Sequence, residues 1–417
     1  MDHCQSAMRN WRIAIITATA IAVILKLYLA LTTLGSNDVL TWQSFLNNVK
    51  AFGGIGTYQR PGVFGDPYNH PPFMIHVLKV LGFLSDMTPL PFRFWIRLPA
   101  IIADVGSVWL LLKLKTPRLM LLLFCLCPAA ILISGFHGNT DPVMVFFLLL
   151  SVYAFERFNS DWLAGLAFGM ALNIKIVPLI FIPAIFFYLS NIKRRVVFFG
   201  VALAILFVAS LPYIMIDPNL IGHKMLGYGS TYNRWGWPLI LNFIFLPRST
   251  LPLIGYDSAI LHRFLFSYSK YGILIFVVVI SWFMNRRHAN QPSLFFQYGL
   301  IISLFLTLTP GFGVQYLAWL IPFVIALGES RTIFYYASSG AYLFAIYGFW
   351  SDGTFYFANS TTHQTPTVPV FALSLLCWLS VTVAFIKYLI TLLHRTTLSN
   401  KRIMGLAALL FVLYPCR

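Results

Sequence analysis

The sequence has few charged residues, and acids are the scarcest of them. Only 10% of its 417 residues are charged, and 12 acids stand against 29 Lys and Arg residues. The longest hydrophilic stretch, residues 35–72, is shorter than most autonomous soluble domains. With 59% hydrophobic residues and a mean hydropathy of +0.78, a soluble fold of this size is excluded. We therefore predict an all-α, polytopic membrane protein with one transmembrane domain over residues 1–417.

Cysteine is also scarce, with five residues in the whole chain. Cys125 and Cys127 lie inside an apolar run, where they fit small packing residues better than ligands. The other three, Cys4, Cys377 and Cys416, are scattered. We expect neither a disulfide framework nor a metal site from them.

The apolar runs predict about eleven to thirteen membrane spans, several of them shorter than the ~20 residues that cross a bilayer unaided. No clear small-residue cleavage site follows the first run, so we expect a retained span and not a removed signal peptide. The predicted spans are residues 11–33, 98–114, 119–136, 141–156, 162–175, 176–190, 196–216, 267–285, 294–309, 314–329, 332–350 and 368–392, with a short one at 403–415.

The net charge of +17 is distributed as an orientation signal and not as a nucleic-acid-binding surface. With the N-terminus in the cytoplasm, the predicted inner loops carry most of the basic residues, which is the positive-inside pattern. These residues are Arg9, Arg12, Lys113, Lys115, Arg118, Arg157, Lys193 to Arg195, Arg286, Arg287, Arg331, Arg395, Lys401 and Arg402. We predict an integral, multi-pass protein of a bacterial inner membrane, with membrane lipids and no nucleic acid among its partners.

The polar segments that packing does not explain lie on the outer face in this orientation. They are a first outer loop at residues 35–97, the turn His137–Asp141, the turn at Lys175, a second large outer loop at 217–266, the turn 309–316 and the loop 351–367. A transporter would place such groups near the midplane of the membrane, on broken helices. Their position on one side predicts a site at the outer membrane surface.

The first outer loop is predicted to lie in the membrane interface. Asp38 follows the first span directly, where it either N-caps the next helix or belongs to a site. The apolar residues after it fall on one helical face, as in a helix that lies along the surface. They are Val39, Trp42, Leu46 and Val49, joined by Phe45 and Phe52.

A tight irregular loop, "GVFGDPYNHPPF", follows this helix. Its Gly and Pro residues indicate turns, and its polar residues precede a Pro-Pro helix start. Asp66, Tyr68 and His70 are candidate site residues, although His70 also fits a turn residue with a satisfied hydrogen bond.

These segments, in this order, resemble the GT-C superfamily of polytopic membrane glycosyltransferases. Asp38, the amphipathic helix and "YNHPPF" come first, and "FHGNTDPVMVFFLLL" looks like the polar turn between the third and fourth spans of those enzymes. "ALNIKIVPLIFIP" resembles the K-x-x-P segment of the bacterial branch that depends on polyprenyl-phosphate-mannose. "TPGFGVQYLAWLIPF" is similar to a stretch in that branch and in the GPI mannosyltransferase family. The resemblance implies transfer of a hexosyl residue, mannosyl by preference, from a polyprenyl-phosphate sugar donor to a lipid or glycan acceptor.

The chemistry of such a transfer assigns roles to the candidate residues. The resemblance and the need for a carboxylate at headgroup level make Asp38 the general base that takes a proton from the acceptor hydroxyl. Lys175 is the first expected unpaired cation for the leaving phosphate, because an embedded charge costs about 2.5–3.5 kcal/mol unless something compensates it. Arg234 is the second, because a guanidinium binds phosphate oxygens in bidentate fashion. Snorkelling of Lys175 and an interfacial position of Arg234 are the alternatives. The residues predicted to line the sugar pocket or hold its loops are Asp66, Tyr68, His70, His137, Asn139, Asp141, Gln315 and Tyr316.

Several alternatives stay open at this point. Asp141-Pro142 also fits a plain helix start, with Asp at the N-cap and Pro at N1. Many GT-C enzymes carry paired acids in the first loop, whereas this chain has Asn37-Asp38, so we predict no cofactor and leave a divalent metal as an unsupported alternative.

Two other functions are the alternatives to sugar transfer. One is a polytopic transporter or lipid flippase, with Lys26, Asp104 and Lys387 as its mid-span charges. The other is a lipid-linked polysaccharide ligase or polymerase, which fits a large late outer loop rich in Arg, whereas the largest outer loop here comes first. The sequence does not indicate which sugar or which acceptor is used.

Overall fold

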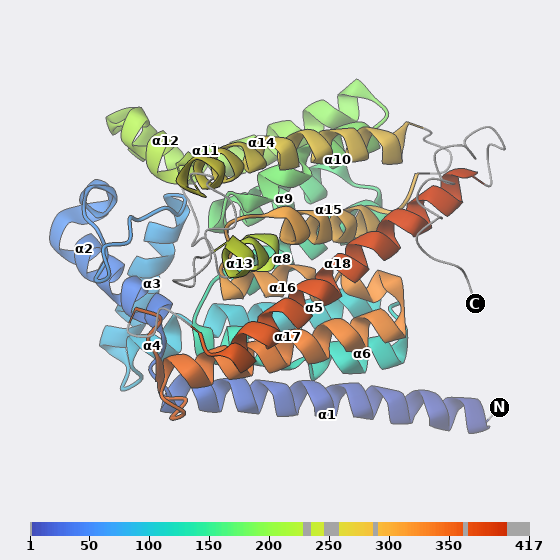
Figure 1. Ribbon diagram of the computed structural model, residues 1–417, viewed down its shortest axis with the longest axis horizontal. Helices are drawn as coiled ribbons and strands as arrows, with labels where there is room; N and C mark the ends of the chain where they lie inside the picture. The colour runs from blue at the N-terminus through green and yellow to red at the C-terminus, as the bar shows by residue number, and fades with distance from the viewer. Residues whose placement is uncertain (1, 228–234, 246–257, 287–290, 362–365, 398–417) are drawn as a thin grey trace.

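The computed structural model describes residues 2–227, 235–245, 258–286, 291–361 and 366–397. In these residues the chain is almost entirely helical, and its only strands are two of two residues each. Figure 1 shows the long helices lying side by side in one bundle. The all-α, polytopic class predicted from composition is therefore confirmed.

The elements are named in chain order. The first half contains α1 (Asp2–Thr32), β1 (Gly35–Ser36), α2 (Asn37–Gln59), α3 (Phe73–Met87), α4 (Phe92–Trp95), α5 (Leu98–Lys113), α6 (Arg118–Cys125), α7 (Pro128–Leu132), the π-helix η1 (Ile133–His137), α8 (Asp141–Phe158), α9 (Asp161–Ile174), the 3-10 helix η2 (Val177–Phe181) and α10 (Ile182–Tyr188). The second half contains α11 (Ile192–Ile216), α12 (Pro218–Leu226), α13 (Gly236–Phe245), α14 (Ser258–Asn285), α15 (Leu294–Leu308), the 3-10 helix η4 (Val314–Tyr316), α16 (Leu317–Leu320), the 3-10 helix η5 (Val324–Leu327), α17 (Glu329–Trp350), β2 (Phe357–Ala358) and α18 (Val368–Thr397).

Six segments are long and apolar enough to cross a membrane, among the residues that the structure describes. They are Asn10–Thr32, Phe92–Lys113, Arg118–His137, Ile192–Ile216, Tyr268–Asn285 and Val368–Arg395. Shorter apolar segments, Asp161–Ile174, Val177–Tyr188 and Leu294–Leu308, belong to the same bundle. The predicted total of about eleven to thirteen spans counted such short helices, and it stays a prediction.

Residues 314–329 do not form the continuous span that we predicted. α16 has only four residues, and the 3-10 helices η4 and η5 lie on either side of it. Pro322 supplies no backbone donor, and Gly328 has a φ of 85°, so a regular helix cannot run through either position. The segment is apolar enough for a membrane span, but these two residues interrupt its helix.

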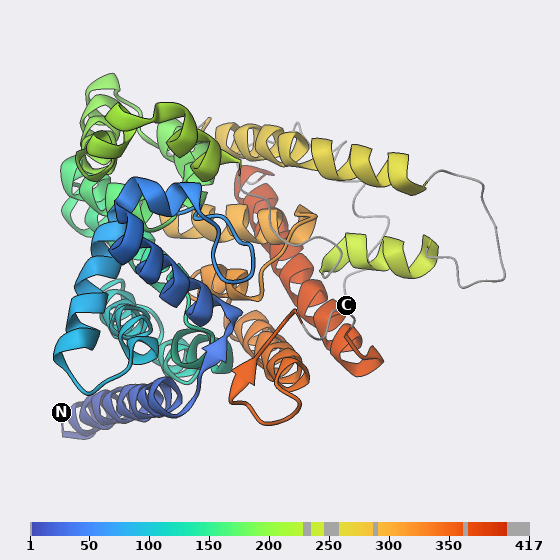
Figure 2. The same cartoon turned by 90° about the vertical axis from the view of Figure 1, so that its left-hand side faces the viewer.

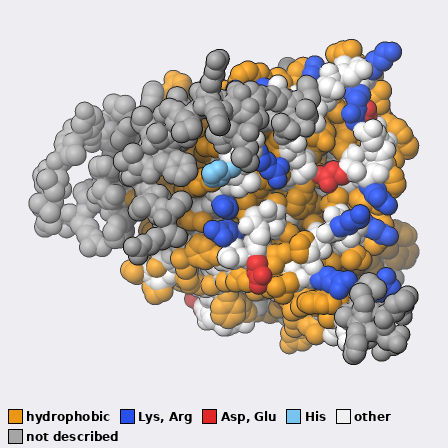
Figure 3. Space-filling model, turned by 90° about the vertical axis from the view of Figure 1, so that its right-hand side faces the viewer, with side chains coloured by type: hydrophobic (Ala, Val, Ile, Leu, Met, Phe, Trp, Pro, Cys, Tyr) orange, Lys and Arg blue, Asp and Glu red, His pale blue; other side chains and the backbone are white. Residues whose placement is uncertain are grey.

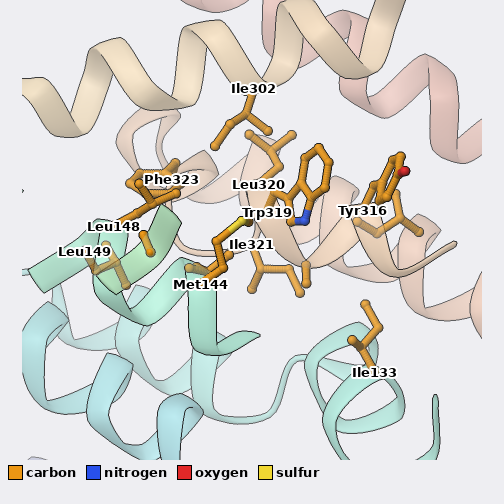
Figure 4. Packing of buried hydrophobic residues seen from close by; sticks show 14 of the residues in the cluster. Ile133, Met144, Leu148, Leu149, Ile302, Tyr316, Trp319, Leu320, Ile321 and Phe323 are labelled. Atoms are coloured by element: carbon orange, nitrogen blue, oxygen red, sulfur yellow. The ribbon is translucent and has the colours of Figure 1, made fainter. Parts of the chain in front are cut away.

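The broken segment lies in the centre of the bundle. Figure 4 shows Trp319 and Leu320 of α16 packed with Met144 of α8 and Ile302 of α15, and all four side chains are buried. Because lipid is as apolar as these side chains, close packing and not the hydrophobic effect holds such helices together.

The two ends of the bundle differ in structure. In Figure 1, α1 begins and α18 ends at the right-hand end, whereas α2, α3, α4 and α12 gather at the left-hand end. Figure 2 shows α2 and α3 crossing in front of the ends of the other helices. Residues 35–97 thus fold over one end of the bundle.

The opposite end is basic. Figure 3, which views the right-hand end of Figure 1, shows more Lys and Arg than Asp and Glu side chains. Lys113, Arg157 and Arg395 each lie in the last turn of a helix, in α5, α8 and α18. This is the charge distribution that the positive-inside rule describes, and the orientation itself stays a prediction.

α2 carries the predicted apolar face. Five of its positions are at most 5% exposed: Val39, Trp42, Phe45, Leu46 and Val49. Phe52, the sixth predicted position, is 50% exposed instead. The helix bends at Gly53, which has a φ of 70°, and the guanidinium of Arg60 lies 3.7 Å from the centre of the Phe52 ring.

A short parallel strand pair joins two loops that are distant in sequence. β1, just after α1, pairs with β2 near the C-terminal end of the chain. Next to it, Asn37 Nδ2 donates to Asn359 Oδ1 at 3.1 Å, and Asn37 Oδ1 accepts from the backbone N–H of Ser360 at 2.7 Å. The late loop therefore holds the start of α2 in place, a contact that the sequence did not indicate.

Two glycines allow α9 and α11 to touch through their backbones. A Cβ on Gly165 would lie 2.5 Å from the carbonyl oxygen of Phe198, and one on Gly169 would lie 2.7 Å from that of Ala202. Small residues four positions apart commonly mediate close packing of membrane helices. α9 ends directly before Lys175, so this contact helps to position a candidate site residue.

Gly165→Ala should lower stability by about 1–3 kcal/mol, because the added methyl meets backbone atoms that cannot turn aside. Gly200→Ala is the matched control on α11, where nothing lies within 4 Å of an added Cβ and alanine favours the helix by up to about 1 kcal/mol. Thermal unfolding in one detergent should give a lower Tm for the first variant and an equal or higher Tm for the second. Equal Tm values for both variants would contradict the close contact of α9 and α11.

Candidate active site

The position of Asp38 depends on Arg97, whose side chain is fully buried at the end of α1. Its Nη1 donates to the carbonyl oxygens of Leu29, Ala30 and Thr33 at 3.1–3.2 Å, and its Nη2 donates to that of Leu34 at 2.6 Å. The last carbonyls of a helix lack internal partners and carry partial negative charge, so a guanidinium satisfies them well. No carboxylate pairs with Arg97 within the described residues.

Two glycines pack directly against this guanidinium. Gly35 has a φ of 93°, and a Cβ there would collide with Arg97. Gly138 has a φ of 82°, and a Cβ there would collide with Val39 and lie 3.4 Å from Arg97 Nε. Both positions therefore require glycine, and both loops of the site rest on the same buried side chain.

Ser36 connects these two loops and begins α2. Its hydroxyl donates to the backbone carbonyl of His137 at 2.7 Å and accepts from the backbone N–H of Asp38 at 3.2 Å. Ser36 is thus the N-cap, and Asp38 lies in the first turn of the helix. The alternative that Asp38 itself caps this helix is wrong, because Ser36 performs that role.

Asp38 contacts the turn that follows η1. Its Oδ2 accepts from Asn139 Nδ2 at 2.5 Å and lies 3.2 Å from His137 Nε2. The Asp38 side chain is 32% exposed, whereas that of His137 is 5% exposed. Burial alone would raise the pKa of Asp38, but His137, Asn139 and the charge of Lys175 outweigh it, so the pKa is lowered and the carboxylate is ionised at neutral pH.

The backbone of residues 133–139 places the side chains of His137 and Asn139 next to Asp38. The π-helix η1 ends at His137, and the left-handed Gly138 turns the chain so that Asn139 lies beside it. Asn139 Oδ1 accepts from the backbone N–H of Asp141 at 3.1 Å, which leaves its Nδ2 to face Asp38. π-helical turns occur often at functional sites, for this ability to redirect side chains.

Lys175 is paired, contrary to our expectation of a free cation. Its Nζ lies 3.0 Å from both carboxylate oxygens of Asp141, and the indole N–H of Trp319 donates to Asp141 Oδ1 at 2.5 Å. The ammonium also lies 5.3 Å from the ring centre of Tyr316 and 5.8 Å from that of Trp319. The Lys175 side chain is 12% exposed and that of Asp141 is fully buried.

Asp141 does not cap α8 as the helix-start alternative required. Thr140 is the N-cap of α8, and Asp141 is the first helical residue, one position later. Its carboxylate is fully buried and holds Lys175 and Trp319 in place, while its predicted part in the sugar pocket or its loops stays a prediction.

The first outer loop brings His70 to the same place. Its ring lies 4.5 Å from that of Trp42, and Nδ1 lies 3.2 Å from the carbonyl oxygen of Ile174, the residue before Lys175. That carbonyl can only accept, so Nδ1 carries the proton and Nε2 is free of it in the neutral ring. Burial, together with the charge of Lys175, lowers the pKa of His70 to about 4.

Asp66 lies at the surface, and Tyr68 lies in the interior. Asp66 is exposed and accepts a long 3.4 Å hydrogen bond from Thr41. Partial loss of water around the carboxyl group, together with the charge of Asp38, raises its pKa. Tyr68 is fully buried between the rings of Phe45 and Tyr58, with centroid distances of 5.0 and 4.8 Å. Its ring packs the loop, whereas Asp66 remains accessible to a ligand.

The remaining predicted site residues differ in burial, and one of them lies outside the described residues. Tyr316 is 3% exposed and stacks on Trp319 with ring centres 4.2 Å apart, so it supports the Lys175–Asp141 pair. Gln315 is partly exposed beside it. Arg234, the second predicted phosphate ligand, lies outside the described residues.

Sequence reasoning missed three side chains of this site. Arg97 had only one signal, a charge at the start of the apolar run "IRLPAIIADVG". Trp319 lay within a quoted stretch but was not singled out, and Tyr347 of α17, which stacks on His137 at 5.7 Å, had no signal beyond an apolar helix. No three His, Cys, Asp or Glu side chains come together to hold a metal ion in the part of the chain that the structure describes.

Comparison with known proteins connects part of this site to sugar transfer. The profile of a protein family described as "Mannosyltransferase (PIG-M)" matches residues 133–246. The chain is 31% identical over 153 residues to "Putative mannosyltransferase YkcB" of Bacillus subtilis (strain 168), and the aligned region covers 32% of this chain and 21% of that protein. It is 26% identical over 148 residues to "GPI mannosyltransferase 1" of Candida albicans, and this alignment covers 33% of each chain.

The chain therefore spans a third or less of the length of the curated relatives that it matches. The matched family segment includes η1, the 137–141 turn and Lys175. The resemblance to mannosyltransferases stated from the motifs is confirmed for this segment.

His70 should make the stability of the protein sensitive to mild acid. The unfolded chain takes up a proton on this ring near pH 6.5, whereas the folded protein does so only at about pH 4. Stability is thus fully present above pH 6.5 and falls by about 3 kcal/mol as the pH is lowered to about 4. Asp38 adds nothing to this loss in that pH range, because its lowered pKa reduces stability only below its ordinary value of 3.8.

Thermal unfolding between pH 4 and 7 measures this effect. His70→Gln keeps an amide donor for the Ile174 carbonyl and should flatten the pH dependence, while His223→Gln on the exposed surface of α12 should not. An unchanged slope in His70→Gln would show that the ring titrates normally in the folded protein.

Proposed function

We propose that this protein is an integral membrane mannosyltransferase that acts at the outer face of the membrane. It transfers a mannosyl residue from a polyprenyl-phosphate-linked donor to a lipid or glycan acceptor, with Asp38 as the general base. The observation that carries the proposal is a partly exposed, ionised carboxylate at one end of a membrane helix bundle, held by His137 and Asn139 and stabilised in its charged form by Lys175. The family match over residues 133–246 and the printed names of the two relatives favour mannose as the sugar.

Asp38 has the properties that a base for this reaction needs. The acceptor hydroxyl attacks the anomeric carbon, the bond from that carbon to the phosphate oxygen breaks, and the hydroxyl proton passes to a carboxylate. One Asp38 oxygen is held by Asn139 and His137, which leaves the exposed part of the carboxylate for the acceptor. Carboxylates perform the same task toward water in inverting glycoside hydrolases.

Lys175 serves the leaving phosphate. An ammonium has three N–H donors, and Asp141 accepts two of them, so the third is available for a phosphate oxygen. The Asp141 carboxylate and the flanking rings of Tyr316 and Trp319 fix its direction. Donor groups fixed in advance stabilise a developing negative charge more than mobile ones do. Arg234 remains the proposed second phosphate ligand.

The transporter alternative relied on mid-span charges, and two of these contact one another. Lys26 Nζ lies 2.5 Å from Asp104 Oδ2, and the Ser134 hydroxyl donates to the same oxygen at 2.5 Å. The pair joins α1 and α5 to η1, the element that carries His137. The contacts among Lys26, Asp104 and Ser134 connect α1, α5 and η1, which accounts for the two charges without a transport pathway.

The test is to supply the purified full-length protein with labelled polyprenyl-phosphate mannose, with polyprenyl-phosphate glucose as the comparison, and to identify the labelled product. Asp38→Asn should lower the transfer rate about a hundred- to ten-thousand-fold, because the amide cannot take the proton. Asp86→Asn is the matched control, since its exposed pair with Lys50 lies on the surface of α3. Full activity of Asp38→Asn would refute its role as the base, and no transfer of either sugar by the wild type would refute the function.

The Lys175–Asp141 pair gives a second test, which separates folding from donor binding. Lys175→Met alone leaves a buried carboxylate unpaired and should cost about 3–5 kcal/mol. Adding Asp141→Asn removes that charge, keeps an acceptor for Trp319 and should restore most of the Tm. The double variant should still show a raised KM for the donor and an unchanged KM for the acceptor.

The matched control is the exposed pair Lys50–Asp86, whose double replacement should change stability by less than about 1 kcal/mol and neither KM. If the Lys175→Met/Asp141→Asn variant kept the wild-type KM for the donor, Lys175 would not contact the phosphate.

A further inference from the structure

The last turn of α17 carries two buried side chains with unused hydrogen-bonding groups. Tyr347 is fully buried and Trp350 is 7% exposed, and their rings lie 6.2 Å apart. Neither the Tyr347 hydroxyl nor the Trp350 indole N–H has a hydrogen-bond partner among the described residues. Residues three apart on a helix share one face, so both groups belong to the same surface of α17.

This surface adjoins the site. The Tyr347 ring stacks on that of His137 with an interplanar angle of 26°, and it also contacts Phe136 at 5.1 Å. The His137 ring is 5% exposed and its Nε2 lies 3.2 Å from Asp38 Oδ2, but neither ring nitrogen has a well-formed hydrogen bond in the described parts of the chain. The Tyr347 hydroxyl, the Trp350 indole N–H and Nδ1 of His137 thus all lack a partner, in three residues whose rings follow one another away from Asp38.

Two other buried phenols of α17 show the hydrogen bond that the Tyr347 hydroxyl lacks. Tyr335 and Tyr336, on the same helix, donate to the carbonyl oxygens of Leu317 and Ile321 at 2.5 and 2.8 Å. A buried polar group normally finds a partner, because leaving it without one destabilises the fold. The hydroxyls of Tyr68 and Tyr298 also lack a partner, but of these three phenols only Tyr347 stacks on His137, which contacts Asp38.

Lys175 and Tyr347 have different neighbours. Lys175 pairs with Asp141 and lies 5.3 Å from the ring centre of Tyr316, whereas Tyr347 contacts the rings of His137 and Phe136. If the donor phosphate lies at Lys175, the side of Tyr347 is left for the acceptor. Sites built to bind a substrate hydroxyl contain such buried groups, and they discriminate strongly against analogues that lack the hydroxyl.

We propose that Tyr347, with Trp350 and Nδ1 of His137, forms an acceptor subsite that binds a hydroxyl next to the attacking one. The acceptor is then a polyol such as a sugar ring, and not a lipid alcohol with a single hydroxyl. This inference rests on the proposed function and adds the chemical class of the acceptor to it.

The test combines a protein variant with substrate analogues, using the full-length protein and labelled polyprenyl-phosphate mannose. The acceptors are octyl α-mannoside, its monodeoxy analogues and octanol. The wild type should lose about tenfold in kcat/KM with the deoxy analogue that lacks the contacted hydroxyl, and should use octanol far less well than the mannoside. Tyr347→Phe should lose about as much with the parent mannoside and show no further loss with that analogue.

The change in Tyr347→Phe should appear in the KM for the acceptor and not in that for the donor. Its Tm should equal or exceed that of the wild type, because the variant removes a buried hydroxyl without a partner and keeps the ring. Tyr336→Phe is the matched control: it breaks the hydrogen bond to Ile321, so it should lower the Tm and leave the wild-type discrimination between acceptors intact.

Three results would overturn the subsite alone: wild-type kinetics in Tyr347→Phe, a raised KM for the donor only, or equal use of octanol and the mannoside by the wild type. Failure of the wild type to transfer mannose to any of these acceptors or to membrane lipids would instead overturn the proposed function, and the subsite with it.

Discussion

The buried guanidinium of Arg97 at the end of α1 is the contact on which the rest of the site depends. It satisfies the last carbonyls of the first span, and through Gly35 and Gly138 it supports the two loops that meet at Asp38. A cation this deep would be very costly without compensation. Here the compensation is the partial negative charge of a helix end, which is fixed in space and carries no proton that could be lost. The same interaction therefore removes the cost of the charge and fixes where α2 begins.

Two aspartates near the start of α2 and of α8 have different surroundings. Asp141 is fully enclosed, its charge matched by Lys175 and one of its oxygens held by Trp319, so its contribution is to position a cation. Asp38 keeps a third of its side chain exposed and is held ionised by polar neighbours on one edge. Burial and partners alone thus distinguish two identical functional groups, one enclosed and paired and the other exposed and available for the proposed role of base, and many active sites assign acid and base roles in this way.

The class of the protein and the sidedness of its polar segments could be predicted from the sequence, because apolar runs and basic loops are local signals. Asp38 could also be proposed locally, as an acid just past a span. The pairing of Lys175 with Asp141 could not, since it joins residues 34 positions apart and depends on how α8 and α9 pack. The same holds for Arg97, whose partners lie more than 60 positions earlier, and for Tyr347, which reads as one more aromatic residue in an apolar helix. The break at residues 314–329 was missed for a different reason, because the apolar pattern was weighted above Pro322 and Gly328.

The places where helices break are also the places where the site forms. Non-helical backbone at membrane depth is tolerated only where protein or a water-filled cavity surrounds it. The turn after η1, the extended residue Lys175 at the end of α9 and the 3-10 turns around α16 are tied together by the hydrogen bonds and the ion pair that link Asp141, Lys175 and Trp319. These contacts leave the three side chains little freedom to move, and Asn139 of the same turn holds Asp38 beside them. Fixed polar groups of this kind are what a reaction that creates charge requires, because no reorganisation is needed when the charge appears.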